Sequence, residues 1–194
     1  MRKLLVFVLL IHALSTPLLA QSLSQALNNN DTSAALQIIK AGYNFDSTDE
    51  SGSSILLSFC RATDDTVNIN FLLNHGAKAD YPKSPTGRTA LIVACAYYGG
   101  VPLCRVLLNH GADVNAVTKK GETALMLAAK NAKYDVVVFL LKQGANAKLT
   151  DASGKTALDY AKAADIDETM KKMLSCCEVD KEKTIQLLAQ TLNK

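Results

Sequence analysis

Apolar residues in this chain gather in short runs that are separated by polar segments rich in glycine, asparagine and aspartate. The run over 90–98 follows a threonine and carries small residues on one side, and the run over 124–131 has the same pattern. A second apolar run follows each of them after a brief turn, over 102–109 and over 135–143. Runs of this length and spacing predict pairs of short α-helices joined by tight turns.

The helix pairs are related copies of one unit. Glycines 52, 87, 121 and 154 follow one another at intervals of 35, 34 and 33 residues, and the last three each open a Gly-x-Thr-Ala-Leu segment. A second marker keeps the same period: Ala41-Gly42, His75-Gly76-Ala77, His110-Gly111-Ala112 and Gln143-Gly144-Ala145. Two markers with one period indicate stacked structural units. The glycines of the second marker are expected to end the second helices, because glycine adopts a left-handed cap without steric penalty.

The repeated unit resembles the ankyrin repeat, which has a T-P-L-H-x-A opening, an L-L-x-x-G-A-D-V-N close and a period of about 33 residues. The best copies here are TALMLAA over 123–129 and LLNHGADVN over 107–115. The resemblance covers about residues 22–177. It implies an all-α solenoid of about five helix-turn-helix units with outward loop tips, whose concave face binds other proteins.

We place the repeats at about 22–51, 52–86, 87–120, 121–153 and 154–177, within a domain that spans 21–194. The first and last units are degenerate, as expected where a solenoid meets water. Helices over 22–28 and 32–40 should form the first pair, and a helix over about 180–193 should close the stack. The Pro-Leu-His of the family is replaced by Ala-Leu-Ile, Ala-Leu-Met and Ala-Leu-Asp, so its histidine hydrogen bonds are expected to be absent.

The first 20 residues have the pattern of a secretory signal peptide. Arg2 and Lys3 precede an apolar run over 4–11, and cleavage is expected after Ala20. An uncleaved anchor is the alternative, but the run is far shorter than the roughly 20 residues that span a bilayer. Cleavage removes two of the 21 basic residues and none of the 18 acidic ones, a balance that disfavours nucleic acid and anionic membranes as partners. We therefore expect a periplasmic or secreted protein of an exported bacterial type.

The sequence contains no convincing catalytic or cofactor motif. The segment 151–156 ends like a phosphate-binding loop, but Leu149 stands where that loop requires glycine. The acidic segment 46–50 lacks the glycine and the closing glutamate of a calcium-binding loop. His75 and His110 lie beside capping glycines and are expected to serve the helix ends. We therefore expect no enzymatic activity, no metal and no cofactor.

Five cysteines raise the question of disulfides. Cys60 and Cys95 occupy one position of successive first helices, where they are expected to be buried thiols too far apart to bridge. Cys95 and Cys104 lie in one repeat and form the possible disulfide, which an exported protein could make. The odd number leaves at least one free thiol, expected in the adjacent Cys176 and Cys177.

Surface residues are the remaining functional candidates. The family's concave face, carried onto this chain, comprises Asp49, Glu50, Tyr81, Lys83, Arg88, Tyr97, Tyr98, Lys119, Lys120, Glu122 and Lys130. Paired tyrosines and cations are typical anchors for a protein partner.

The leading hypothesis is a non-catalytic, monomeric interaction module of the periplasm that sequesters, inhibits or escorts a partner protein. An immunity protein against a delivered toxin is one form of this hypothesis. The alternatives are a companion that protects an envelope enzyme and a secreted effector that docks a host protein. A toxin gene next to this one would favour immunity, and recovery of the protein outside the cell would favour the effector.

Overall fold

The computed structural model describes residues 16–63, 65–80, 84–164 and 177–193. Within these ranges the secondary structure consists of ten helices and one isolated antiparallel bridge between Val117 and Thr123. The helices are α2 (Thr16–Asn28), α3 (Thr32–Lys40), α4 (Ile55–Ala62), α5 (Thr66–Asn74), α6 (Ala90–Ala96), α7 (Val101–Asn109), α8 (Ala124–Lys130), α9 (Tyr134–Lys142), α10 (Ala157–Lys162) and α12 (Cys177–Leu192). The predicted all-α solenoid is confirmed.

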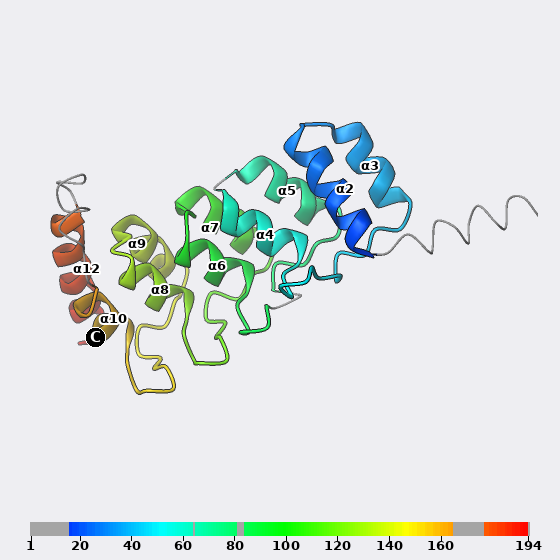
Figure 1. The fold of residues 1–194 in the computed structure, drawn as a ribbon. Coiled ribbons are helices and arrows are strands. Elements are labelled where there is room, and N and C mark those ends of the chain that lie inside the picture. Colours follow the sequence, from blue (N-terminus) through cyan, green and yellow to red (C-terminus); the bar gives the residue numbers. More distant parts are fainter. Residues whose placement is uncertain (1–15, 64, 81–83, 165–176, 194) are drawn as a thin grey trace, which may run out of the picture.

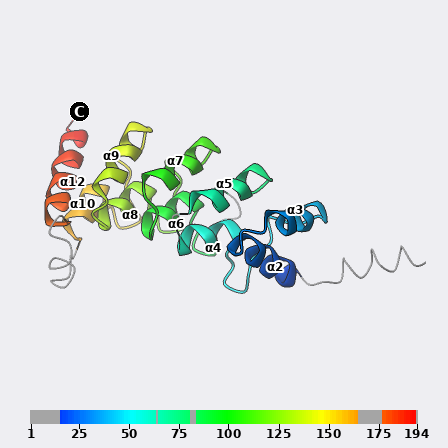
Figure 2. The same cartoon turned by 90° about the horizontal axis from the view of Figure 1, so that it is seen from above.

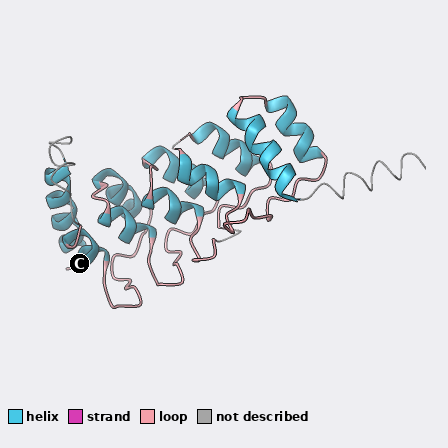
Figure 3. Ribbon diagram, viewed as in Figure 1, coloured by secondary structure: helices cyan, strands magenta, loops and turns pink. Residues whose placement is uncertain are grey.

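The helices stand in two rows, as Figure 2 shows. The first helices of successive units, α4, α6, α8 and α10, pack side by side in one row, while α5, α7 and α9 do so in the other. Each unit also packs its own two helices together, as in the pairs α6–α7 and α8–α9. The loops between units project from one side of the stack (Figures 1 and 3). Each unit that the structure describes in full therefore adds one helix pair, and we call each projecting loop between units a finger.

The first helices begin at a hydroxyl residue that caps the first turn. The side chain of Thr123 accepts a hydrogen bond from the backbone N–H of Met126 at 3.2 Å, and Ser54 does the same for Leu57 at 3.3 Å. Such a cap satisfies one of the first-turn donors that have no partner inside the helix, and it contributes about 1 kcal/mol. The threonine of the repeated Gly-x-Thr segment thus sets where each first helix starts.

Three second helices end at a glycine in the left-handed conformation. Gly111 has a φ of 83°, and its N–H donates to Leu108, while the next N–H, that of Ala112, donates to Leu107. The same pair of bonds closes α5 at Gly76 and α9 at Gly144. These are the two bonds of the Schellman cap, so the predicted capping role of the three glycines is confirmed.

The two histidines beside these caps bond to the ends of their own helices. Nδ1 of His75 lies 2.7 Å from the carbonyl oxygen of Phe71, and Nδ1 of His110 lies 2.9 Å from that of Val106. Because a carbonyl oxygen only accepts, Nδ1 is the protonated nitrogen in both rings. The predicted service of the histidines at the helix ends is confirmed.

The helix that the pattern predicted over 90–98 ends earlier, at Ala96. The chain then turns tightly, and the N–H of Gly99 donates to the carbonyl of Ala94 at 3.0 Å. A Cβ atom on Gly99 would lie only 2.6 Å from that oxygen, so the turn admits glycine alone. The extra residue of this unit is absorbed in the turn. The other helices predicted in the two central units shift by no more than one residue at either end.

Because the helix ends early, its last carbonyl groups have no hydrogen-bond donor within the helix. The following unit supplies donors for them. The amide of Asn131 donates to Cys95 and Ala96 at 3.2 and 3.1 Å. The ammonium of Lys133 donates to Ala94, Gly99 and Tyr97. Burial lowers the pKa of Lys133, because the charged form is harder to hold away from water. Two side chains of one unit thus hydrogen-bond to the backbone of the preceding unit and stabilise the packing between them.

The two ends of the stack differ from the centre. At the start, α2 begins at Thr16, so cleavage after Ala20 would leave the part of this helix from residue 21 onward. At the other end, the closing helix predicted over about 180–193 is α12, which packs on both α9 and α10. In this way α12 extends the row of second helices beyond α9.

The core lies between the two rows and is built from small and aliphatic side chains. Leu91, Leu107, Leu140 and Ala161 are fully buried there. Among the residues that the structure describes, no helix is both long and apolar enough to cross a bilayer.

Candidate partner-binding groove

The fingers end in turns of one design, with tips at 49–52, 84–87, 118–121 and 151–154. In each tip the glycine N–H donates to the carbonyl three residues earlier, at distances between 2.7 and 2.9 Å. The first tip residue also donates its own N–H to the carbonyl four residues ahead. These paired bonds make every fingertip a small closed hairpin.

In each hairpin the side chain at the first tip position accepts hydrogen bonds from backbone N–H groups of the same finger. The carboxylate of Asp151 accepts from the backbone N–H groups of Ser153 and Lys155 at 2.8 and 2.9 Å. The hydroxyl of Thr118 accepts from Lys120 and Glu122 in the same way. Asp49, a predicted partner-binding residue, ties the first tip by accepting from Ser51 and Ser53. The pKa of Asp49 is lowered by its hydrogen bonds with Ser51 and Ser53, against the effect of burial.

The second, third and fourth fingertips are joined through their backbones. The N–H of Lys119 donates to Thr86 at 3.0 Å, and that of Ala152 donates to Lys120 at 2.8 Å. The approach is so close that a Cβ atom on Gly87 would lie 2.9 Å from the nitrogen of Lys119. Glycine is needed at this tip for its positive φ and for the space as well. The fingers therefore form a stiff ribbon beside the first helices.

Two hollows open where this ribbon meets the row of first helices. The arginine hollow, with a volume of about 350 Å³, is lined by Ser51, Ser53, Arg61, Ser84, Pro85, Thr86, Arg88 and Tyr97. The carboxylate hollow, of about 280 Å³, is lined by Glu122, Lys130, Asp151, Lys155, Asp159, Tyr160 and Ala163. The two hollows lie on the side of the fold where the sequence predicted the binding face.

Tyr97 brings two guanidinium groups together in the arginine hollow. Its ring is 39% exposed, and the guanidinium carbon of Arg61 lies 5.8 Å from the ring centroid. Nη1 of Arg88 lies 3.5 Å from the hydroxyl of the same tyrosine. A guanidinium at such a distance from an aromatic face makes a cation–π contact. The predicted residues Arg88 and Tyr97 are thus side by side.

In the carboxylate hollow the carboxylates accept hydrogen bonds from hydroxyl groups and from the backbone. The hydroxyl of Tyr160 donates to Asp151 at 2.8 Å and lies 3.4 Å from Glu122. The carboxylate of Asp159 accepts from the N–H and the hydroxyl of Thr156, at 2.8 and 2.7 Å. The pKa of Asp159 is lowered chiefly by these bonds, and that of Asp151 is lowered first by the bond from the Lys155 backbone. Burial and the bond to Asp151 raise the pKa of Tyr160.

The other predicted residues lie at different places along the surface formed by the fingertips and the first helices, which we call the groove. Glu50, Lys119 and Lys120 are exposed at fingertips, and Lys130 is exposed at the end of α8. Glu122 is half-buried against Thr118 and Tyr160, so it supports the fingers. Tyr81 and Lys83 lie outside the described residues.

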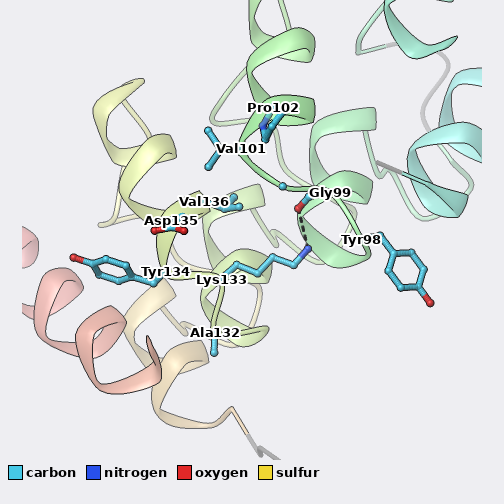
Figure 4. A pocket seen from close by; sticks show the side chains of 10 residues that line it. Tyr98, Gly99, Val101, Pro102, Ala132, Lys133, Tyr134, Asp135 and Val136 are labelled. Carbon is cyan, nitrogen blue, oxygen red and sulfur yellow. Dashed lines mark hydrogen bonds between the residues drawn. The ribbon is translucent and has the colours of Figure 1, made fainter. Parts of the chain in front are cut away.

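Tyr98 does not join Tyr97 in the arginine hollow. It is 74% exposed and lines a third hollow of about 410 Å³, formed by the turns that precede α7 and α9. Figure 4 shows its side chain pointing away from Lys133, whose ammonium reaches Gly99. The two adjacent tyrosines therefore serve separate surfaces.

Sequence reasoning missed Arg61, although the repeat contains the signal that identifies it. Arg61, Ala96 and Lys130 each follow their fingertip glycine by nine positions. Lys130 was predicted to bind a partner, so alignment of the units would have added Arg61 at the same site. Tyr160 could not be found in this way, because the equivalent position of the preceding unit holds the buried Leu127.

The three cysteines that the structure describes in full are buried thiols. Cys60 is a free thiol, and burial raises its pKa to about 12. The sulfur atoms of Cys95 and Cys104 lie 3.8 Å apart as a thiol pair. Cys176 lies outside the described residues. Within the described part of the chain, no three His, Cys, Asp or Glu side chains gather as metal ligands would.

Comparison with protein families agrees with the repeat and the fold. A family model described as ankyrin repeats (3 copies) matches residues 23–118, and one described as ankyrin repeats (many copies) matches residues 107–161. The chain belongs to the ankyrin-repeat family. Ankyrin repeats form an interaction module that binds other proteins on its concave surface.

Individual relatives share the repeats over part of their length. An ankyrin repeat-containing protein of Treponema pallidum (strain Nichols) is 32% identical over 124 residues, which are 64% of this chain and 41% of that protein. The mitochondrial disaggregase of Bos taurus is 44% identical over 71 residues, or 37% of this chain and 10% of that protein. The Neurogenic locus Notch protein of Drosophila melanogaster is 34% identical over 122 residues, or 52% and 4%. This chain thus spans less than half of these ankyrin-repeat relatives.

The departures from the ankyrin motif have structural replacements. Where the family has the histidine of Pro-Leu-His, Met126 accepts the N–H of Thr123 through its sulfur at 3.4 Å, and Asp159 accepts that of Thr156. Both side chains complete a capping box at the start of a first helix. In this chain, α8 and α10 are therefore capped at their N-termini without the usual histidine.

Proposed function

We propose that this chain is a non-catalytic protein of the periplasm that binds one partner protein through its groove and thereby sequesters, inhibits or escorts it. The observation that carries the proposal is the arginine hollow. There an exposed aromatic ring and two cations converge on a surface of the ankyrin fold that the family uses for binding. Tyrosine and arginine are the residue types that most often anchor protein interfaces.

The stiffness of the fingers supports binding at this site. The second tip, which lines the arginine hollow, is joined to the third by the backbone hydrogen bond from Lys119 to Thr86, and Ser84 accepts a hydrogen bond from the N–H of Arg88 within the same finger. A surface that is ordered before the partner arrives loses little conformational entropy on binding. The groove thus favours a specific partner over transient contacts.

The N-terminal pattern supports the periplasmic location, since a charged head and an apolar run precede Ala20. Neutralisation of a toxin delivered to that compartment is one form of the proposal, and protection of an envelope enzyme is another. Fractionation followed by mass spectrometry of the N-terminal peptide tests the location. We expect a periplasmic protein that begins at Gln21. A full-length protein in the cytoplasm would contradict this part of the proposal.

Capture of the partner from periplasmic extract tests the binding site. We expect the unmodified mature chain to enrich one protein, and the double variant R88A/Y97A to bind it at least about tenfold more weakly. The double variant K142A/Q143A is the control, because both residues are exposed at the end of a second helix, away from the hollows. The variant Y98A reports separately on the third hollow. Loss of the partner with K142A/Q143A and retention with R88A/Y97A would place binding on the opposite face.

A further inference from the structure

The arginine hollow holds more positive charge than the described part of the fold neutralises. Arg61 donates to the hydroxyl of Ser53 and stacks near Tyr97, while Arg88 reaches the hydroxyl of Tyr97. No described carboxylate forms an ion pair with either guanidinium. The two like charges repel each other, and an anion placed between them would offset that repulsion.

Asp49 is a described acidic group on which the charge of Arg61 acts electrostatically. Its carboxylate is already used by the N–H groups of Ser51 and Ser53 and by the hydroxyl of Ser51. Among these three described groups, the two guanidinium charges exceed the carboxylate charge by one positive charge. A singly charged anion matches that balance better than a phosphate, which carries close to two charges.

We propose that the arginine hollow receives the carboxylate of an aspartate or glutamate side chain of the partner protein. The inference rests on the proposed function and states which chemistry of the partner is recognised. A guanidinium presents a planar set of donors that matches the two oxygens of a carboxylate. The hydroxyl groups of Ser84 and Thr86 line the same hollow, and its volume of about 350 Å³ has room for an acidic side chain.

The acidic side chain enters beside the exposed ring of Tyr97. Its methylene groups then cover the ring, and its carboxylate lies between the guanidinium groups of Arg61 and Arg88. Charge-assisted hydrogen bonds of this kind are stronger than neutral ones, and they weaken as salt screens the charges. Recognition therefore depends on both arginines and on ionic strength.

Titration of the mature chain with an oligoglutamate peptide tests the inference, with NMR observation of the arginine Nε–H groups. We expect the signals of Arg61 and Arg88 to shift, and the affinity to fall at least tenfold in R61Q/R88Q. The control is R105Q, because Arg105 also stacks on an aromatic ring, at 5.0 Å from the centroid of Phe139, but on the row of second helices. R105Q should bind the peptide as the unmodified chain does.

Three results would overturn the inference. One is equal weakening by R105Q and by R61Q/R88Q, which would indicate diffuse attraction to the whole surface. Another is an equal shift with oligoglutamine or with inorganic phosphate, and the third is no binding of oligoglutamate at low salt. In each case R88A/Y97A can still lose the partner captured from extract. The proposed function would then stand while the carboxylate assignment falls.

Discussion

The arginine hollow and the carboxylate hollow are built from the same parts of the repeat, yet their charged groups have different roles. In the carboxylate hollow, Asp151 and Asp159 are occupied by Tyr160, Thr156 and backbone N–H groups. In the arginine hollow, Arg61 and Arg88 contact the neutral side chains of Ser53 and Tyr97, and Asp49 acts on Arg61 only through its charge. A charged residue on a repeat surface can thus stabilise the fold or remain available to a partner, and position in the unit does not tell which.

The comparison teaches that hydrogen-bond partners are better guides to function than charge. Glu122 and Arg88 directly follow a fingertip glycine in successive units, and both were predicted to bind a partner. Glu122 accepts hydrogen bonds from the hydroxyls of Thr118 and Tyr160, whereas the guanidinium of Arg88 lies near the hydroxyl of the exposed Tyr97. Changes at the carboxylate hollow should therefore affect stability, and changes at the arginine hollow should affect binding.

The largest expected effect comes from the fingertip that carries the arginine hollow. Gly87→Ala places a Cβ atom 2.9 Å from the nitrogen of Lys119 on a residue with a φ of 80°. Strain and displacement together should lower the free energy of unfolding by about 2–3 kcal/mol. Gly144→Ala is the control, since it has a φ of 88° but no atom within 4 Å of the added carbon. It should cost about 1 kcal/mol. Urea unfolding of both variants measures the difference, and equal losses would contradict the tight approach of the fingers.

A smaller effect is expected when a tyrosine hydroxyl is removed from either hollow. Tyr160→Phe leaves Asp151 without its side-chain donor and should cost about 1 kcal/mol of stability, with partner affinity unchanged. Tyr97→Phe removes a contact at 3.5 Å on an exposed ring, so its stability should change by less than about 0.5 kcal/mol. Unfolding curves and partner affinities of the two variants test the comparison directly. It would fail if Tyr160→Phe weakened binding more than Tyr97→Phe did.

The carboxylate hollow should also make stability depend on pH on the acid side. The pKa values of Asp151 and Asp159 are lowered in the folded chain, so the unfolded chain binds protons more readily. Their stabilising effect is complete above the unfolded pKa, near 4, and disappears as the pH falls through the folded values. We expect the Tm to fall below about pH 4, and to fall less in D159N. An equal acid-side fall of Tm in D159N would exclude this role for Asp159.

The smallest expected effect concerns the three buried thiols. At pH 8 Cys60 should not react with iodoacetamide in the folded chain, because it is buried and its pKa is raised to about 12. Mass spectrometry before and after unfolding shows whether it becomes labelled only on unfolding. The same spectra under non-reducing conditions reveal whether Cys95 and Cys104 remain thiols or lose two hydrogens to a bridge. Either state should leave partner affinity unchanged, because both sulfurs lie in the core.

Much of the fold could be predicted from the sequence because its signals are local. The glycine that follows His110 requires a left-handed cap, and the threonine at 123 requires a helix start, whatever surrounds them. The period of these signals then predicts the stack. The early end of α6 was missed because it depends on contacts between units, where Asn131 and Lys133 satisfy the carbonyl groups of the shortened helix.

The binding face was carried over from the resemblance to the ankyrin repeat, while the amino-acid sequence by itself determined the repeat and the two helices of each unit. Those features follow from backbone preferences and apolar spacing, which act within a few residues. Only the tertiary structure decided that Arg61 meets Arg88 across Tyr97 and that Tyr98 faces another hollow. Residues from different units meet only after the helices have stacked. The availability of a charge to a partner then depends on which neighbours the stack brings to it.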